Sequence, residues 1–190
     1  MRLVLLACVV VLTGCGREPE TPLVQAARKG DTASLRALLA AGADANRADA
    51  GGNHWTPLMH AVHKGQAEAA RLLLEAGADV DRHTEDGVTA LIMAAAYGNA
   101  DIVRMLLERG ADPRARAGGG ITALGNAAGG GALFDITDGP PLGTCNVETV
   151  RALLERDPSL RLEGPVGGAT ARWFRRGHSC EEVAALLGGS

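Results

Sequence analysis

The sequence predicts an all-α solenoid of about four stacked helix-turn-helix units, with projecting finger loops and a degenerate C-terminal cap. Three observations predict it. Gly-Ala-Asp triplets lie 35 and 33 residues apart, at residues 42–44, 77–79 and 110–112. Thr-x-Leu triplets keep the same period, and they begin at Thr21, Thr56, Thr89 and Thr122. A glycine follows each threonine by nine residues. A period near 33 indicates one supersecondary unit that is copied and stacked.

Residues 86–112 show how one unit is built. Thr89 offers a hydroxyl group at the N-terminus of a first helix, and Gly98 ends that helix. A second helix starts near Asn99. Its apolar stripe consists of Ile102, Val103, Leu106 and Leu107. Neither helix alone buries enough apolar surface, so each unit must pack against its neighbours.

These motifs resemble the ankyrin repeat, because Asp-Gly-x-Thr-x-Leu, Ala-Ala, Gly, Leu-Leu and Gly-Ala-Asp recur in register. Another helix-pair solenoid is the alternative. The resemblance implies an ankyrin-repeat domain over residues 21–187, with fingers at about a right angle to paired helices and a concave face that binds proteins. Its units are expected at about residues 21–48, 49–83, 84–116 and 117–162, followed by a cap at 163–187.

Two units depart from the period. The first finger is longer than the next, because the repeat spacing there is 35 residues rather than 33. Its tip is therefore expected to protrude. In the fourth unit, Val150 takes the position of Val103, which implies an insertion at residues 132–145. Its prolines and glycines exclude a continued helix.

The N-terminus is similar to the signal peptide of a bacterial lipoprotein. A basic start and the apolar run Leu3–Leu12 precede Leu12-Thr13-Gly14-Cys15, which matches a lipobox. The resemblance implies that residues 1–14 are cleaved, that Cys15 carries a lipid, and that residues 15–20 form a tether. In a Gram-negative cell it implies an outer-membrane lipoprotein that faces the periplasm. An ordinary secretory signal is the alternative, whereas the run is too short for a transmembrane helix.

The remaining cysteines, Cys145 and Cys180, each lie just before a second helix. In an oxidising compartment this pair predicts a disulfide bond, with two free thiols or a metal pair as alternatives. His54, His60 and His63 could form a zinc site, but we see no carboxylate or cysteine that completes it and expect surface histidines. The sequence predicts no metal site.

Charge and motifs exclude several function classes. The net charge is −3 and no basic run is present, which argues against nucleic-acid binding. The serines lie outside any nucleophile elbow, and the Gly118-Gly119-Gly120 run lacks the lysine of a phosphate loop. We therefore expect a protein that is not an enzyme and needs no cofactor.

The family resemblance implies that a partner contacts the fingertips and the exposed ends of the first helices. The helix-end positions are Arg28, Lys29, His63, Lys64 and Tyr97. The finger positions are Asn53, Trp55, His83, Glu85, Asp86, Val88, Arg116 and Ile121. Aromatic residues are typical of binding hot spots, although the Trp55 ring could instead fold back onto its own finger.

Together these features predict a monomeric, non-catalytic interaction module that is tethered to the bacterial envelope and binds another, periplasmic protein. Two alternatives are an immunity protein that neutralises a secreted toxin and an accessory factor for a periplasmic stress-defence enzyme. The residues indicate the mode of binding, not the identity of the partner.

Overall fold

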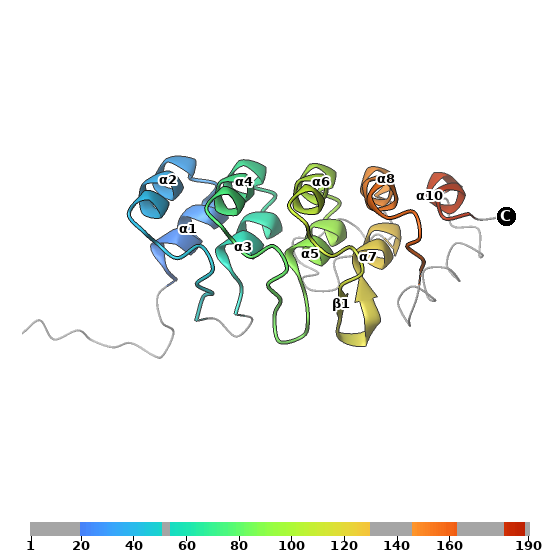
Figure 1. Cartoon of the computed structure of the whole chain (residues 1–190), viewed down its shortest axis with the longest axis horizontal. Coiled ribbons are helices and arrows are strands. Elements are labelled where there is room, and N and C mark those ends of the chain that lie inside the picture. The colour runs from blue at the N-terminus through green and yellow to red at the C-terminus, as the bar shows by residue number, and fades with distance from the viewer. Residues whose placement is uncertain (1–19, 51–53, 130–145, 163–180, 189–190) are drawn as a thin grey trace, which may run out of the picture.

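The computed structural model describes residues 20–50, 54–129, 146–162 and 181–188. Its helices form two rows, which confirms the predicted all-α repeat solenoid (Figure 1). The inner row consists of α1 (Pro22–Lys29), α3 (Pro57–His63), α5 (Ala90–Ala96) and α7 (Ala123–Gly129). The outer row consists of α2 (Thr32–Ala40), α4 (Ala67–Glu75), α6 (Ala100–Glu108), α8 (Val147–Arg156) and α10 (Glu181–Leu186).

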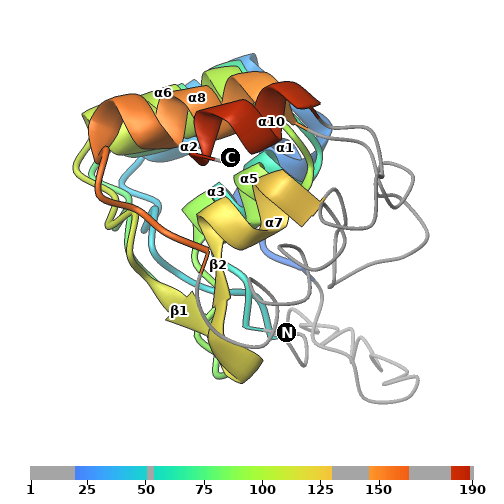
Figure 2. The same ribbon diagram turned by 90° about the vertical axis from the view of Figure 1, so that its right-hand side faces the viewer.

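The fingers connect an outer helix to the next inner helix and project away from both rows (Figure 2). We number them finger 1 (residues 44–56), finger 2 (79–89) and finger 3 (112–122). Finger 3 contains a short hairpin, with β1 (Arg116–Ala117) antiparallel to β2 (Ile121–Thr122) and a 3-10 turn (Gly118–Gly120) between them. The Gly118 amide donates to the Asp86 carbonyl oxygen at 2.7 Å, so fingers 2 and 3 are in direct contact.

Threonine hydroxyls start all four inner helices, as the sequence predicts. Each Oγ1 accepts a hydrogen bond from the backbone amide three residues later, at 3.0–3.3 Å. This bond satisfies one of the amides that a helix leaves unpaired at its start. The caps are Thr21, Thr56, Thr89 and Thr122.

The glycines after the inner helices also link neighbouring repeats. Gly98 has a φ of 69°, a left-handed conformation that favours glycine. A Cβ there would lie 2.4 Å from Oδ1 of Asn146, the residue that precedes α8 in the next repeat. Gly30 of the first repeat and Gln66, the residue that precedes α4 in the second repeat, show the same arrangement. The missing side chain therefore lets the next repeat pack closely.

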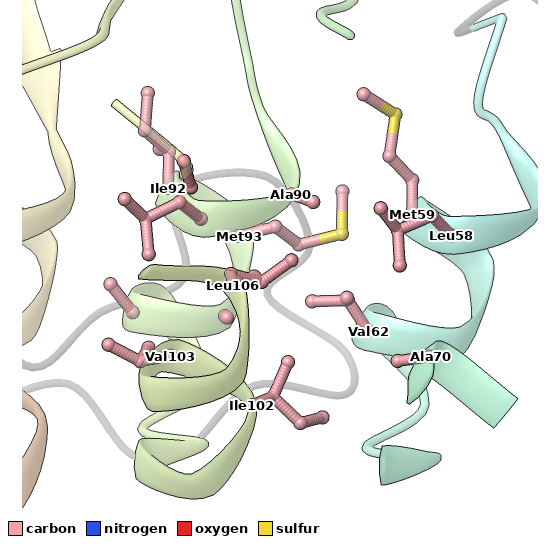
Figure 3. Packing of buried hydrophobic residues seen from close by; sticks show 14 of the residues in the cluster. Leu58, Met59, Val62, Ala70, Ala90, Ile92, Met93, Ile102, Val103 and Leu106 are labelled. Atoms are coloured by element: carbon pink, nitrogen blue, oxygen red, sulfur yellow. The ribbon is translucent and has the colours of Figure 1, made fainter. Parts of the chain in front are cut away.

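The core runs between the repeats. Every residue of α5 is buried. Figure 3 shows Met59 and Val62 of α3 on one side and Met93 of α5 with Leu106 of α6 on the other. Each buried side chain of this size contributes about 1.5–3 kcal/mol. In the fourth unit Val150 of α8 is buried as Val103 of α6 is, as the sequence predicts.

Ion pairs cross from one outer helix to the next. Partly exposed guanidinium and carboxylate groups meet at 2.8–3.2 Å, and each such pair contributes about 0–1 kcal/mol. The pairs are Arg36–Glu68, Arg104–Glu148 and Arg151–Glu182. The outer surface is therefore a row of matched charges.

Among the described residues, no helix is long and apolar enough to span a membrane. The predicted signal peptide, the tether apart from Glu20, and the insertion at 132–145 lie outside the described residues. So does most of the predicted cap.

Candidate functional site

The side chains of Trp55, His63 and Tyr97 form one aromatic row across two repeats. The Trp55 and His63 ring centroids lie 5.1 Å apart with an interplanar angle of 59°. The His63 and Tyr97 centroids also lie 5.1 Å apart, edge to face at 86°. Trp55 belongs to finger 1, His63 to the end of α3, and Tyr97 to the end of α5. The row therefore joins a finger to the ends of two inner helices.

The sequence left open whether Trp55 meets a partner or folds back on its own repeat. Its ring does pack against α3, since its centroid lies 5.4 Å from that of His60 as well as beside His63. It is nevertheless only half-buried. Trp55 is thus held in place by its own repeat while part of its surface remains accessible.

A carboxylate that the sequence reasoning missed lies beside His60. Asp49 Oδ2 lies 2.7 Å from His60 Nε2, and Asp49 Oδ1 accepts a bond from the Trp55 amide at 3.1 Å. The two side chains are only 13% and 10% exposed. Asp49 therefore fixes the finger backbone and the histidine ring under Trp55 together. Asp49 and His60 share no helix, so only the pairing of finger and helix reveals their contact.

The other helix-end residues lie at the surface. Arg28 and Lys29 are exposed at the end of α1, and Arg28 pairs with Glu20 at 3.0 Å. Lys64 is exposed at the end of α3. The helices that carry these residues are neighbours, because α1 packs against α3 and α3 packs against α5, as Figure 1 shows.

Finger 2 presents His83, Glu85 and Asp86 to solvent. Glu85 is 84% exposed in its side chain and lies 3.8 Å from Nε2 of His54, the finger 1 residue before Trp55. Val88, in contrast, is 7% exposed and belongs to the core, so the predicted partner contact by Val88 is wrong. Its side chain packs inward at the base of the finger and is not available to a partner.

In finger 3, Arg116 is exposed and Ile121 is half-buried. The remaining predicted sites, Cys15, Asn53, Cys145 and Cys180, lie outside the described residues.

In the part of the chain that the structure describes, the arrangement is a surface of aromatic and charged side chains. No group of three or more His, Cys, Asp and Glu side chains gathers there as a metal site would require. Of the three histidines considered for zinc, His54 lies beside Glu85, His60 beside Asp49 and Trp55, and His63 between Trp55 and Tyr97.

We name the surface formed by fingers 1 and 2 and the ends of α1, α3 and α5 the finger face. It comprises Arg28, Lys29, His54, Trp55, His63, Lys64, His83, Glu85, Asp86 and Tyr97.

A family model described as ankyrin repeats, in three copies, matches residues 23–117. A comparison with curated proteins finds no significant match.

Proposed function

This chain belongs to the ankyrin-repeat family, whose repeats are generally protein–protein interaction modules, and we propose that it binds a periplasmic partner through the finger face. The aromatic row carries the proposal. Half-buried Trp55 and Tyr97 offer apolar contact area at little cost in side-chain entropy, because their rings are already held by His63. The proposed activity is binding without chemistry.

The charges around the row favour a polar rim. Lys29 and Lys64 are exposed at the ends of α1 and α3, and Glu85 and Asp86 are exposed in finger 2. An apolar centre within a polar rim is typical of protein interfaces. On the outer row, by contrast, arginines and glutamates of adjacent helices already pair with one another.

Photo-crosslinking in intact cells tests this proposal. A crosslinking amino acid replaces Glu85 on the finger face or Asp101 on the outer row, which is 92% exposed and serves as the matched control. We expect a discrete captured protein from position 85 and none from position 101. Equal capture from both positions would contradict the proposal.

The aromatic row is tested in the same assay. Trp55→Ala and Tyr97→Ala, each introduced beside the crosslinker at position 85, should reduce capture about tenfold or more, as for hot-spot residues. Thermal melting of each variant checks that the repeats remain folded at the assay temperature. Unchanged capture in two folded variants would place the contact elsewhere.

We also propose that a lipid on Cys15 tethers the repeats to the envelope, most directly to the periplasmic side of an outer membrane. The lipobox and the short segment before Glu20 support this proposal. Metabolic labelling with a fatty-acid analogue should mark the wild-type chain and not Cys15→Ala, while Cys145→Ala keeps the label. Release of an unlabelled wild-type chain into the soluble periplasm would favour an ordinary secretory signal.

A further inference from the structure

The first repeat exposes residues at positions that the later repeats bury. We name its outward side the N-terminal pole, which comprises Pro22, Gln25, Ala37, Leu38 and Ala43. The helices α1 and α2 lie at one end of the two rows (Figure 1). Among the described residues no repeat precedes them, so the side of the first repeat that faces away from α3 and α4 meets solvent.

Counterparts of the pole residues in the later repeats show what this exposure means. Pro22 is exposed, whereas Pro57 at the same repeat position is buried. Leu38 is half-buried, whereas its counterparts Leu73 and Leu106 are both 0% exposed. Within the solenoid each repeat is covered by the one before it, since α1 packs against α3 and α2 against α4. The pole is therefore a stacking surface that no described repeat covers.

A groove of about 550 Å³ lies in the pole. All of its lining residues belong to the first repeat and its flanking residues, and Pro22, Leu23, Leu38 and Ala43 supply its apolar part. Exposed apolar surface of this kind marks interaction sites in proteins. The groove therefore needs an occupant that offers apolar surface.

The charges of α2 argue against another helical repeat as that occupant. Its residues Thr32–Ala40 include a single charged side chain, Arg36, which pairs with Glu68 of α4 at 3.2 Å. Glu68 and Glu148 each receive an arginine from the preceding outer helix, and in α2 the same repeat position is Ala33. A repeat stacked on the pole, including one from a second copy of this chain, would find no carboxylate for its arginine.

The pole is close in sequence to the proposed lipid anchor. Five residue steps separate Cys15 from Glu20, which lines the groove. Because an extended chain spans at most about 3.6 Å per residue, the two Cα atoms lie within about 18 Å of each other. The groove also has little net charge, since Glu20 pairs with Arg28 at 3.0 Å and the other charged lining residues, Asp44 and Arg47, have opposite signs.

We infer that the N-terminal pole docks on the phospholipid surface of the membrane that holds the anchor. Pro22, Ala37 and Leu38 then lie at the boundary of headgroups and acyl chains, where interfacial proteins bury their apolar side chains. This inference rests on the proposed lipid on Cys15, because the short tether is what holds the pole against the bilayer. Trp55 and Tyr97 belong to later repeats, so the aromatic row is left for a protein partner.

Fluorescence quenching by lipids tests the inference with the full chain. The lipid-bearing chain is reconstituted into phosphatidylcholine vesicles that contain a nitroxide-labelled phospholipid. A fluorescent amino acid replaces exposed Ala37 on the pole or, as the matched control, Asp101 on α6, which is 92% exposed. We expect severalfold stronger quenching at position 37 than at position 101. High salt should not reduce it, because salt screens charge attraction and not apolar contact.

A charge on the pole should break the contact. Pro22→Glu places a carboxylate in the first turn of α1, where the helix dipole favours it, and should lower quenching at position 37 nearly to that at position 101. Pro22→Ala keeps an apolar residue and should leave quenching unchanged. Ala76→Glu adds the same charge at an exposed position of the second repeat and should also leave it unchanged.

Two results would overturn the inference. One is equal quenching at positions 37 and 101, and a dimeric mass in detergent would then assign the pole to a second copy of the chain. The other is the same loss of quenching from Pro22→Glu and Ala76→Glu, which would indicate only a general effect of charge. Metabolic labelling of Cys15 does not depend on the pole, so a labelled chain with equal quenching would refute this inference and leave the proposed lipid in place.

Discussion

Fingers 1 and 2 close in the same way but support different chemistry. In finger 1, the Asp49 amide donates to the Trp55 carbonyl at 2.9 Å, and in finger 2 the Thr84 amide donates to the Val88 carbonyl at 3.0 Å. The side chains also match, because Asp49 Oδ1 accepts from the Trp55 amide and Thr84 Oγ1 accepts from the Val88 amide, both at 3.1 Å. Either oxygen therefore satisfies the finger backbone.

The difference lies in the second carboxylate oxygen. In finger 1 this oxygen binds His60 of α3, whereas the corresponding residue of α5 in the next repeat is the buried Met93. The residue before the capping threonine changes with it, from half-buried Trp55 to buried Val88. The Asp49–His60 pair therefore occurs beside the half-buried Trp55 ring, whereas the buried Met93 occurs with the buried Val88.

The largest effect is expected from Asp49→Ala. This change removes the acceptor of the Trp55 amide and leaves His60 almost buried without its carboxylate. A lost hydrogen bond and a stranded buried group together should lower the free energy of unfolding by about 3 kcal/mol. Urea denaturation measures it, with exposed Asp101→Ala as the control. A change as small as that of the control would mean that Asp49 does not hold the finger.

Replacing finger 1 chemistry with that of finger 2 sharpens the comparison. Asp49→Thr keeps an oxygen for the Trp55 amide but removes the partner of His60, so it should cost about 1–2 kcal/mol. His60→Met supplies the residue found in the next repeat. The double variant should then recover about 1 kcal/mol relative to the sum of the single changes. A double-mutant cycle by urea denaturation measures this coupling, and strict additivity would contradict direct Asp49–His60 contact.

The matching change in finger 2 should have a smaller effect. Thr84→Ala removes the acceptor of the Val88 amide but strands no second side chain, so about 1 kcal/mol is expected. Thr84→Ser keeps an oxygen and should restore most of the loss. If Thr84→Ala costs as much as Asp49→Ala, the second oxygen of Asp49 contributes nothing and the comparison fails.

Local chemistry explains what the sequence could predict. The threonine caps and the left-handed turn at Gly98 form within one helix or turn, so Thr-x-Leu and Gly predict them, although Gly98 also makes room for Asn146 of the next repeat. The contact between Asp49 and His60 depends on how a finger folds over the next helix, across a segment longer than in the other repeats. Sequence reasoning therefore considered His60 without its carboxylate.

The error at Val88 has a similar cause. Its role was transferred from the family as a finger position, although the aligned residues of the neighbouring fingers, Trp55 and Ile121, are also apolar. Three apolar residues at one repeat position indicate a partly buried base of the finger rather than a fingertip. Comparison of this position across the repeats therefore predicts that Val88 is buried, whereas the family pattern alone predicts that it is exposed.

The smallest effect is expected when acid protonates Asp157, the residue that follows α8. Asp44 and Asp157 both accept a bond from the amide two residues later, at 2.8 and 3.0 Å, but Asp157 also binds the Ser159 hydroxyl and Arg114. The Ser159 hydroxyl is the main cause that lowers the pKa of Asp157 from 3.8.

A lowered folded-state pKa means that this stabilisation is fully present above the unfolded value and is lost as pH falls through the folded value. The amide protection of Ser159 in hydrogen exchange should therefore persist at pH 5 and fall below about pH 4. Ser159→Ala should raise the pKa of Asp157 toward its ordinary value, as a carboxyl-carbon NMR titration measures. An unchanged titration would mean that Arg114 rather than Ser159 controls this carboxylate.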